Sequence, residues 1–276
     1  MDVTRAGALC GLSLISAAAM SGTIIEIERF NDEGERDSTI SIAVQDGKLR
    51  MDQIDEEQQR SGLIYDGSRV IDMEISEGTY VLFDPATLLK AKQTRDPQAT
   101  LREELLAEVP PRRRGDAVRH LSAPPGWMAS KQKVSIQPTT RVSRQAGLYC
   151  RIYEVVSSDR VQFEYCMLDD RTRTDLIEFM NTSERASDLI SEFFGVLGMP
   201  WMQQTMQFYW AHAYDIEGFP LRSTHFEDGD LVSEFRLRSV RQELVAADAF
   251  AIPKNLRRRA LLDFSAPPGE GLAPRN

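Results

Sequence analysis

The strongest constraint on this chain is a series of short alternating segments separated by tight-turn dipeptides. In residues 39–44, Ile40, Ile42 and Val44 alternate with polar residues, a pattern typical of a half-buried strand. Asp46-Gly47 follows and is typical of a two-residue hairpin turn. Similar segments are Thr23–Phe30, Lys48–Asp52, Leu63–Tyr65, Val70–Ile75 and Thr79–Phe83, with turns at Asn31–Gly34, Asp66-Gly67 and Glu77-Gly78. Strands joined this tightly pair antiparallel, so the first half predicts a meander.

The second half alternates in the same way around one long helix. Strands are predicted at Lys131–Ile136, Leu148–Val156, Val161–Leu168, Phe219–Phe226 and Leu231–Leu244. Between them, Asp175–Met199 carries apolar residues at the i, i+3 and i+4 spacing of an amphipathic helix. Shorter helices are predicted at Ala86–Lys92 and Thr100–Glu108, the first beginning at Asp84-Pro85. The fold class is therefore mainly β with helices (α+β), with about ten or eleven strands.

Two regions stand apart from this pattern. Residues 109–126 are rich in proline and arginine, including Pro110-Pro111-Arg112-Arg113-Arg114, and are predicted to be a mobile insertion or a connection between the two halves, outside the packed core. The three arginines are predicted to be solvated, with a lipid-headgroup or partner contact as the alternative. Residues 265–276 are predicted to be a disordered tail. The expected organisation is a signal peptide at 1–21, one domain at 22–264 and this tail.

The N-terminus resembles a secretory signal peptide. A short segment containing Arg5 precedes an uncharged run from Ala6 to Met20, and small residues allow cleavage after Ala19 or Ser21. The run is short for a membrane anchor, which needs roughly 20 apolar residues, although an uncleaved anchor or a buried helix is the alternative. We therefore expect an exported, periplasmic protein with no stable membrane span after cleavage. The net charge of −9 disfavours nucleic acid as a partner.

Removal of the signal peptide leaves Cys150 and Cys166, and an even number of cysteines in an exported chain favours a disulfide. The two cysteines lie on predicted strands joined by Ser157-Ser158-Asp159. A hairpin centred on Ser158 would place Cys150 directly opposite Cys166, and Ile152 opposite Glu164. The alternative is a pair of buried free thiols.

No catalytic or metal-binding pattern is recognisable. His120, His212 and His225 are scattered, and none has a second ligand at the spacing of a zinc site. His225 lies beside Glu227 and Asp228, where a solvent-facing strand histidine is favoured over a metal ligand. Asp169-Asp170 is interpreted as loop chemistry rather than a carboxylate pair. We expect no catalytic residues, no metal and no cofactor.

The most unusual composition is apolar and falls at the end of the long helix. Phe193, Phe194 and Leu197 are followed closely by Trp201 and Met202, and more methionine and aromatic residues extend to Trp210. Such side chains form adaptable surfaces for a variable apolar ligand, and they serve equally well as core. These five residues are the candidate cavity lining.

Several motifs, taken in order, resemble the LolA-like superfamily of periplasmic lipoprotein carriers, in a poorly characterised exported branch. They are Leu63-Ile64-Tyr65-Asp66-Gly67 with Val70–Met73 and Gly78-Thr79-Tyr80, then Gly218-Phe219-Pro220-Leu221-Arg222, and Phe250-Ala251-Ile252-Pro253. The resemblance extends loosely from Thr23 to Phe264. It does not include residues 109–126 or 199–210. It implies an incomplete β-barrel, a strongly curved antiparallel sheet whose concave face is covered by helices and holds acyl chains.

Three functional hypotheses follow. The first is non-enzymatic binding of a lipid or acyl chain, with helix 175–199 as a lid and a lipid or acylated protein as partner. The second is an envelope structural or protein-interaction module with a filled core and an envelope protein as partner. The third is a hydrolase whose site is assembled from distant residues.

Overall fold

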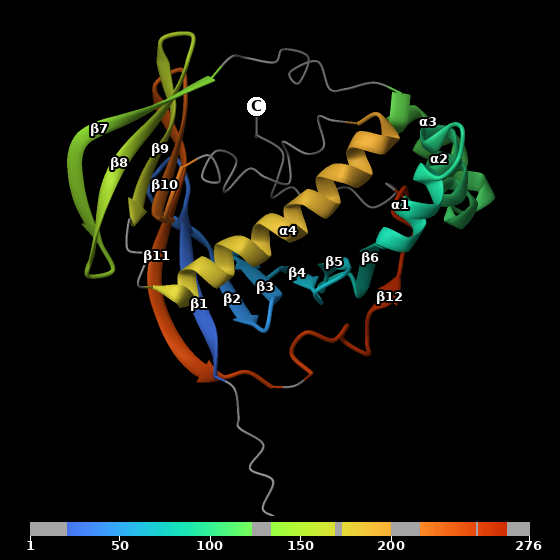
Figure 1. Cartoon of the computed structure of the whole chain (residues 1–276), viewed down its shortest axis with the longest axis horizontal. Coiled ribbons are helices and arrows are strands. Elements are labelled where there is room, and N and C mark those ends of the chain that lie inside the picture. The colour runs from blue at the N-terminus through green and yellow to red at the C-terminus, as the bar shows by residue number, and fades with distance from the viewer. Residues whose placement is uncertain (1–20, 123–133, 169–172, 200–215, 247, 264–276) are drawn as a thin grey trace, which may run out of the picture.

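A computed structural model describes residues 21–122, 134–168, 173–199, 216–246 and 248–263 (Figure 1). Its strands form a single twelve-stranded sheet in the order β12-β6-β5-β4-β3-β2-β1-β11-β10-β9-β8-β7. The strands are β1 (Ser21–Phe30), β2 (Arg36–Gln45), β3 (Lys48–Asp55), β4 (Arg60–Tyr65), β5 (Val70–Glu74), β6 (Thr79–Phe83), β7 (Val134–Gln145), β8 (Leu148–Ser157), β9 (Arg160–Leu168), β10 (Phe219–Glu227), β11 (Asp230–Leu244) and β12 (Arg257–Arg258). The sheet curves strongly, but its outer strands β12 and β7 do not pair with each other, so it remains open. The predicted fold class is confirmed.

The first and last parts of the chain meet at the centre of the sheet. β1 to β6 form the predicted meander, and β7 to β11 form a second antiparallel series. β1 joins the two series by pairing with β11, from Ser21 opposite Leu244 to Phe30 opposite Glu234. The pairing of β12 with β6 is parallel and only two residues long, which explains why no alternating pattern predicted it.

The tight turns follow from residues that tolerate a left-handed backbone. Asp46 and Gly47 both have positive φ, 53° and 68°, as a type I′ hairpin turn requires. Ser158 and Asp159 form a second turn of this kind with φ of 51° and 64°. The turn dipeptides therefore fix where each strand ends.

The helices lie on one side of the curved sheet, and several begin or end at residues suited to that place. They are α1 (Pro85–Lys92), α2 (Pro97–Glu108), the short 3-10 turn η1 (Pro111–Arg113), α3 (Arg114–Ser122) and α4 (Thr174–Leu197). Asp84 and Asp96 cap α1 and α2 by accepting hydrogen bonds from the backbone N–H groups of Ala86 and Ala99. Gly198, with φ of 75°, ends α4 in the left-handed conformation that favours glycine.

α4 crosses the concave face of the sheet and supplies much of its core (Figure 1). Near its start, Phe179 packs edge-to-face against Phe219 of β10, with ring centroids 5.6 Å apart. Near its end, Phe193 packs in the same way against Phe83 of β6, also at 5.6 Å. The helix thereby connects the two series of strands through the main hydrophobic cluster.

The prediction that residues 109–126 lie outside the core is wrong for the described part of this segment. Val109, Ala117 and Leu121 are 1–4% exposed and belong to the main core. Arg113 forms an ion pair with Asp263 at 2.9 Å, so it is not simply solvated. Arg114 donates hydrogen bonds to the carbonyl oxygens of Val109 and Ala107. The high proline and arginine content predicts a loop. It gives no sign that three spaced apolar residues, in and beside a short helix, reach the core.

The predicted disulfide between Cys150 and Cys166 is present, with Cα atoms 5.2 Å apart. The predicted register is wrong, because Ile152 rather than Cys150 lies opposite Cys166, and Glu154 rather than Ile152 lies opposite Glu164. The turn is centred between Ser158 and Asp159, and a β-bulge follows at Val155/Val156. Each of these features shifts the pairing by one residue, so the disulfide links diagonal neighbours.

Candidate ligand-binding face

The register of β1 to β6 places side chains of the concave face in three parallel rows. The row nearest α4, here the covered row, runs across five strands and is 0–7% exposed; it consists of Val44, Leu49, Tyr65, Val70 and Phe83. Two contacts place α4 over it. Phe83 meets Phe193 and Phe194 of the helix, and the backbone N–H of Gly47, in the β2–β3 turn, donates to Glu178 Oε1 at 3.1 Å.

The next row, here the middle row, is mostly apolar but incompletely covered. It consists of Ile25, Ile42, Met51, Leu63, Asp72 and Val81, each opposite the next across the strand pairs. Ile25 and Ile42 are fully buried, whereas Met51 and Leu63 are only partly buried. Apolar surface therefore remains accessible on the concave face beside α4.

The third row, here the outer row, changes from apolar to polar along the sheet. Ile27 and Ile40 are buried at the β1–β2 end, and Gln53, Ser61, Glu74 and Thr79 continue the row through β3 to β6. Outside the covered row, the concave face is thus amphipathic: it is apolar on β1 and β2, and Asp72, Glu74 and Thr79 make it more polar on β5 and β6. A face of this kind suits a ligand with an apolar chain and a polar end.

Two carboxylates on β5 dominate the polar end. Burial raises the pKa of Asp72 to about 6, against the attraction of the Arg259 guanidinium. Burial also raises the pKa of Glu74 to about 7, and the neighbouring charges of Asp72 and Glu77 contribute in the same direction. Both carboxyl groups therefore change charge near neutral pH. Both residues are partly exposed on the sheet.

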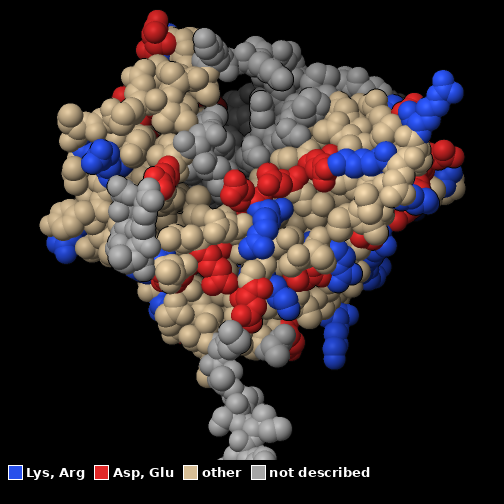
Figure 2. Space-filling model, in the orientation of Figure 1, with Lys and Arg blue, Asp and Glu red and all other residues tan. Residues whose placement is uncertain are grey.

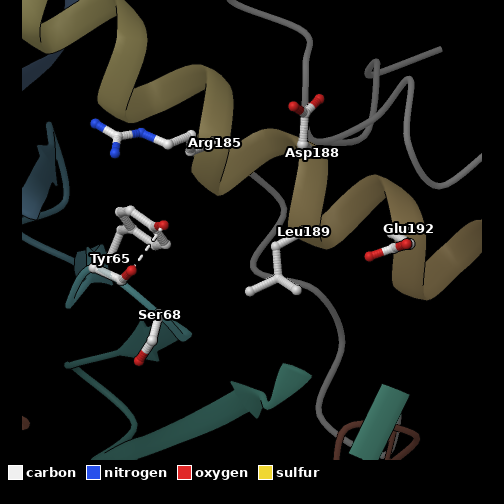
Figure 3. A pocket seen from close by; sticks show the side chains of 7 residues that line it. Tyr65, Ser68, Arg185, Asp188, Leu189 and Glu192 are labelled. Carbon is white, nitrogen blue, oxygen red and sulfur yellow. Dashed lines mark hydrogen bonds between the residues drawn. The ribbon is translucent and has the colours of Figure 1, made fainter. Parts of the chain in front are cut away.

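A separate cleft of about 550 Å³ lies between α4 and the β4–β5 turn (Figure 3). The turn contributes Tyr65, Gly67 and Ser68, and α4 contributes Arg185, Asp188, Leu189 and Glu192. Leu189 points toward the strands, while Asp188 points away from them. The Arg185 guanidinium donates to the Asn181 carbonyl oxygen and to Thr182 Oγ1, both on its own helix. Three of its seven lining residues are charged, and none of them belongs to the middle row.

The structure places three of the five predicted lining residues together. Phe193, Phe194 and Leu197 are 1%, 4% and 0% exposed and lie in the main core. Trp201 and Met202 lie outside the described residues. Met51, Leu63 and Asp72 were not singled out from the sequence, because an alternating strand does not reveal which of its inward positions an opposing helix leaves open.

The prediction that His225 faces solvent is wrong. Its side chain is 9% exposed and stacks on Phe163, with ring centroids 4.6 Å apart, and burial lowers its pKa to about 4. Within the described ranges, no group of three or more His, Cys, Asp or Glu residues is arranged to hold a metal ion. His212 and Asp169-Asp170 lie outside those ranges, as does nearly all of the predicted signal peptide.

The exposed face of α4 is strongly acidic. Glu184, Asp188 and Glu192 are all exposed there, and Figure 2 shows acidic side chains gathered over the helix. Lys92 of α1 pairs with Glu192 at the far end of this row. In the part of the chain that the structure describes, no helix is both long and apolar enough to cross a membrane.

Comparisons with known proteins yield structural likenesses alone. No family model and no curated protein matches the chain. A chain in the structure described as the Pseudomonas aeruginosa MucA/MucB complex matches with a TM-score of 0.37 and 15% identity, covering 86% of this chain and 57% of that chain. This chain therefore spans little more than half of that protein.

Two further solved structures are similar over most of this chain. An uncharacterised conserved protein from Thermus thermophilus has a TM-score of 0.41 and 8% identity, covering 88% of this chain and 92% of that chain. An exported protein with a YmcC-like fold from Bacteroides fragilis has a TM-score of 0.26 and 9% identity, covering 80% of this chain and 96% of that chain. All of these scores are below 0.5, and at such identities the likenesses carry no information about function.

Proposed function

We propose that this chain is an exported, non-enzymatic binding protein that holds a lipid or acyl chain against the concave face of its sheet. The observation that carries the proposal is the incompletely covered middle row, in which Met51 and Leu63 remain partly exposed beside fully buried neighbours. Exposed apolar surface at the bottom of a curved sheet is costly in water, at about 25 cal/mol per Å², and a bound acyl chain removes that cost.

The polarity of the face gives the ligand a direction. The apolar end at Ile25 and Ile42 suits the end of an acyl chain, and the polar end at Asp72 and Glu74 suits a hydroxylated or amine-bearing head. The LolA-like resemblance of the sequence supports the same class of ligand. An acylated protein presenting its lipid would occupy the face in the same way.

In this proposal α4 is the lid, and Phe193, Phe194 and Leu197 contact the ligand when the helix lifts. In the structure these residues are buried in the main core, with both phenylalanines against the covered row, so ligand contact requires movement of α4. Hydrogen bonds hold α4 in place near both ends. The backbone N–H of Gly47 donates to Glu178, and Gln98 Nε2 donates to the Leu197 carbonyl oxygen at 3.0 Å. The Lys92–Glu192 ion pair adds a third fastening.

The first test is native mass spectrometry with lipid extraction on mature protein purified without detergent, followed by titration with a fluorescent fatty acid. Met51→Glu and Leu63→Glu should abolish co-purifying lipid and probe binding, because each places a charge in the middle row. The matched control is Leu89→Glu on α1, where the native leucine is 59% exposed. An apo mass for the wild type, together with no probe binding, would refute the proposal and favour the protein-interaction module.

The lid is tested separately by fixing α4 in place. A water-soluble carbodiimide joins paired amines and carboxylates, so it should form an amide between Lys92 and Glu192. Treated wild type should lose probe uptake, whereas treated Glu192→Gln should retain it because that amide cannot form. Equal uptake by both treated proteins would show that the ligand enters without movement of α4.

A further inference from the structure

The β7–β8 hairpin carries a small patch that is basic and apolar on an otherwise acidic protein. Val142 and Tyr149 are 67% and 68% exposed, among the most exposed large hydrophobic side chains of the described residues. Arg144 lies directly opposite Tyr149, and Arg151 lies directly opposite Val142, so the four side chains share one face. These four residues are here called the hairpin patch.

The strand alternation and the disulfide fix this patch in place. Cys150 lies between Tyr149 and Arg151 in sequence, and it is 3% exposed and bonded to Cys166. Because neighbouring residues of a strand point to opposite faces, an inward Cys150 holds Tyr149 and Arg151 outward. The hairpin forms the outer margin of the sheet, on the side away from α1 to α3 (Figure 1). The patch therefore faces outward on a disulfide-bonded hairpin at the margin of the sheet.

The patch has a local charge opposite to that of the protein. Residues 142–153 contain two arginines and no carboxylate, although the whole chain has a net charge of −9. The Arg144 guanidinium donates to the Gly147 carbonyl oxygen and lies over the Tyr149 ring, 5.4 Å from its centroid. Within the described ranges, Arg144 and Arg151 form no ion pair with a carboxylate, whereas the neighbouring Arg141 pairs with Glu154 and Glu164. Two cations therefore remain available to an anionic partner.

We propose that the hairpin patch docks the protein on an anionic phospholipid surface. Arg144 and Arg151 would contact lipid phosphates, while Tyr149 and Val142 would enter the interfacial layer, where tyrosine is favoured. A stable protein interface buries roughly 800 Å² on each partner, far more than four side chains can supply. A membrane interface has no such requirement, because a few inserted side chains add to the electrostatic attraction. The acidic face of α4 would be directed away from the membrane.

The test is flotation of lipid-free protein with vesicles of phosphatidylethanolamine and phosphatidylglycerol, compared with vesicles of phosphatidylcholine. The wild type should float with the anionic vesicles alone and should be released by salt. Replacement of both arginines in Arg144→Glu/Arg151→Glu should lower the partition coefficient at least about 25-fold, about five-fold for each arginine removed. Tyr149→Ser should lower it several-fold without changing the net charge.

The matched control is Lys254→Glu/Arg257→Glu, which changes the net charge equally at exposed positions near the opposite edge of the sheet. This control should float almost as well as the wild type. Equal losses in the two double variants would overturn the proposal, because they would show a general charge effect. Failure of the wild type to float, or flotation of the Arg144→Glu/Arg151→Glu variant at wild-type level, would also overturn it. Probe binding measured without vesicles is independent of this result, so the two proposals fail separately.

Discussion

Replacement of Asp72 by asparagine should stabilise the protein above neutral pH. Burial raises the pKa of this carboxyl from 3.8 to about 6, so the folded state binds its proton more tightly than the unfolded state. The free energy of unfolding is therefore unaffected by Asp72 ionisation below about pH 4, and it falls as the pH rises through about 6 and Asp72 loses its proton. The difference between these two pKa values corresponds to about 3 kcal/mol. Asparagine at this position resembles the protonated acid and removes this loss, so we expect a gain of about 2–3 kcal/mol at alkaline pH and almost none in acid.

Urea unfolding followed by circular dichroism across this pH range measures the effect. The control is Glu103→Gln, which neutralises an exposed carboxylate on α2. It should change the free energy of unfolding by less than about 0.5 kcal/mol at every pH. Equal stability of wild type and Asp72→Asn at alkaline pH would refute the argument. A gain of the same size at all pH values would also refute it, because the effect would then arise from packing rather than ionisation.

Two further predictions concern the parts that hold the concave face together. Replacing both Cys150 and Cys166 by alanine should lower the free energy of unfolding by about 3 kcal/mol, the loop-closure value for this separation. Urea unfolding measures the change. A loss below about 1 kcal/mol would show that the hairpin persists in the unfolded chain. Phe193→Ala should lower the free energy of unfolding by about 3–5 kcal/mol, because Phe193 is 1% exposed and packs on Phe83. Leu89→Ala, at an exposed position, should lower it by less than about 0.5 kcal/mol. Similar losses in the two variants would contradict the assigned core.

The strands and turns of this fold are predictable because their signals are local. Asp46-Gly47 and Asp66-Gly67 mark turns that the structure contains, and the alternation of Ile40, Ile42 and Val44 matches their burial at 3%, 1% and 0%. The long helix is equally clear, since its apolar residues recur at helical spacing over 24 residues. By contrast, β12 has two residues and pairs only because the chain passes the edge of β6 there. No local pattern encodes such a contact.

Details that depend on several elements at once could not be predicted. The diagonal disulfide depends on a bulge at Val155/Val156, and nothing in the local sequence requires a bulge there. His225 is buried because Phe163 stacks on it from the neighbouring strand, although its own neighbours Glu227 and Asp228 are polar. The burial of Val109, Ala117 and Leu121 likewise depends on how α3 and the segment before it meet the core. In each case tertiary contacts override local composition.

The candidate site likewise depends on tertiary contacts that local sequence patterns do not encode. Sequence patterns place Phe193 and Leu197 on the apolar side of α4, and they cannot reveal whether that side meets a ligand or a strand. The tertiary structure supplies the missing information. The register aligns Met51, Leu63 and Asp72 in one row, and the contacts of α4 with Phe83 and Gly47 place the helix over the neighbouring row. An acid in an otherwise apolar row is a poor way to stabilise a sheet, since leucine or valine at position 72 would pack better against Leu63 and Val81. In the structure the Arg259 guanidinium offsets part of this cost. Under the proposed function a polar contact with the bound ligand would offset more of it, and this connects the pH-dependent stability to the proposal.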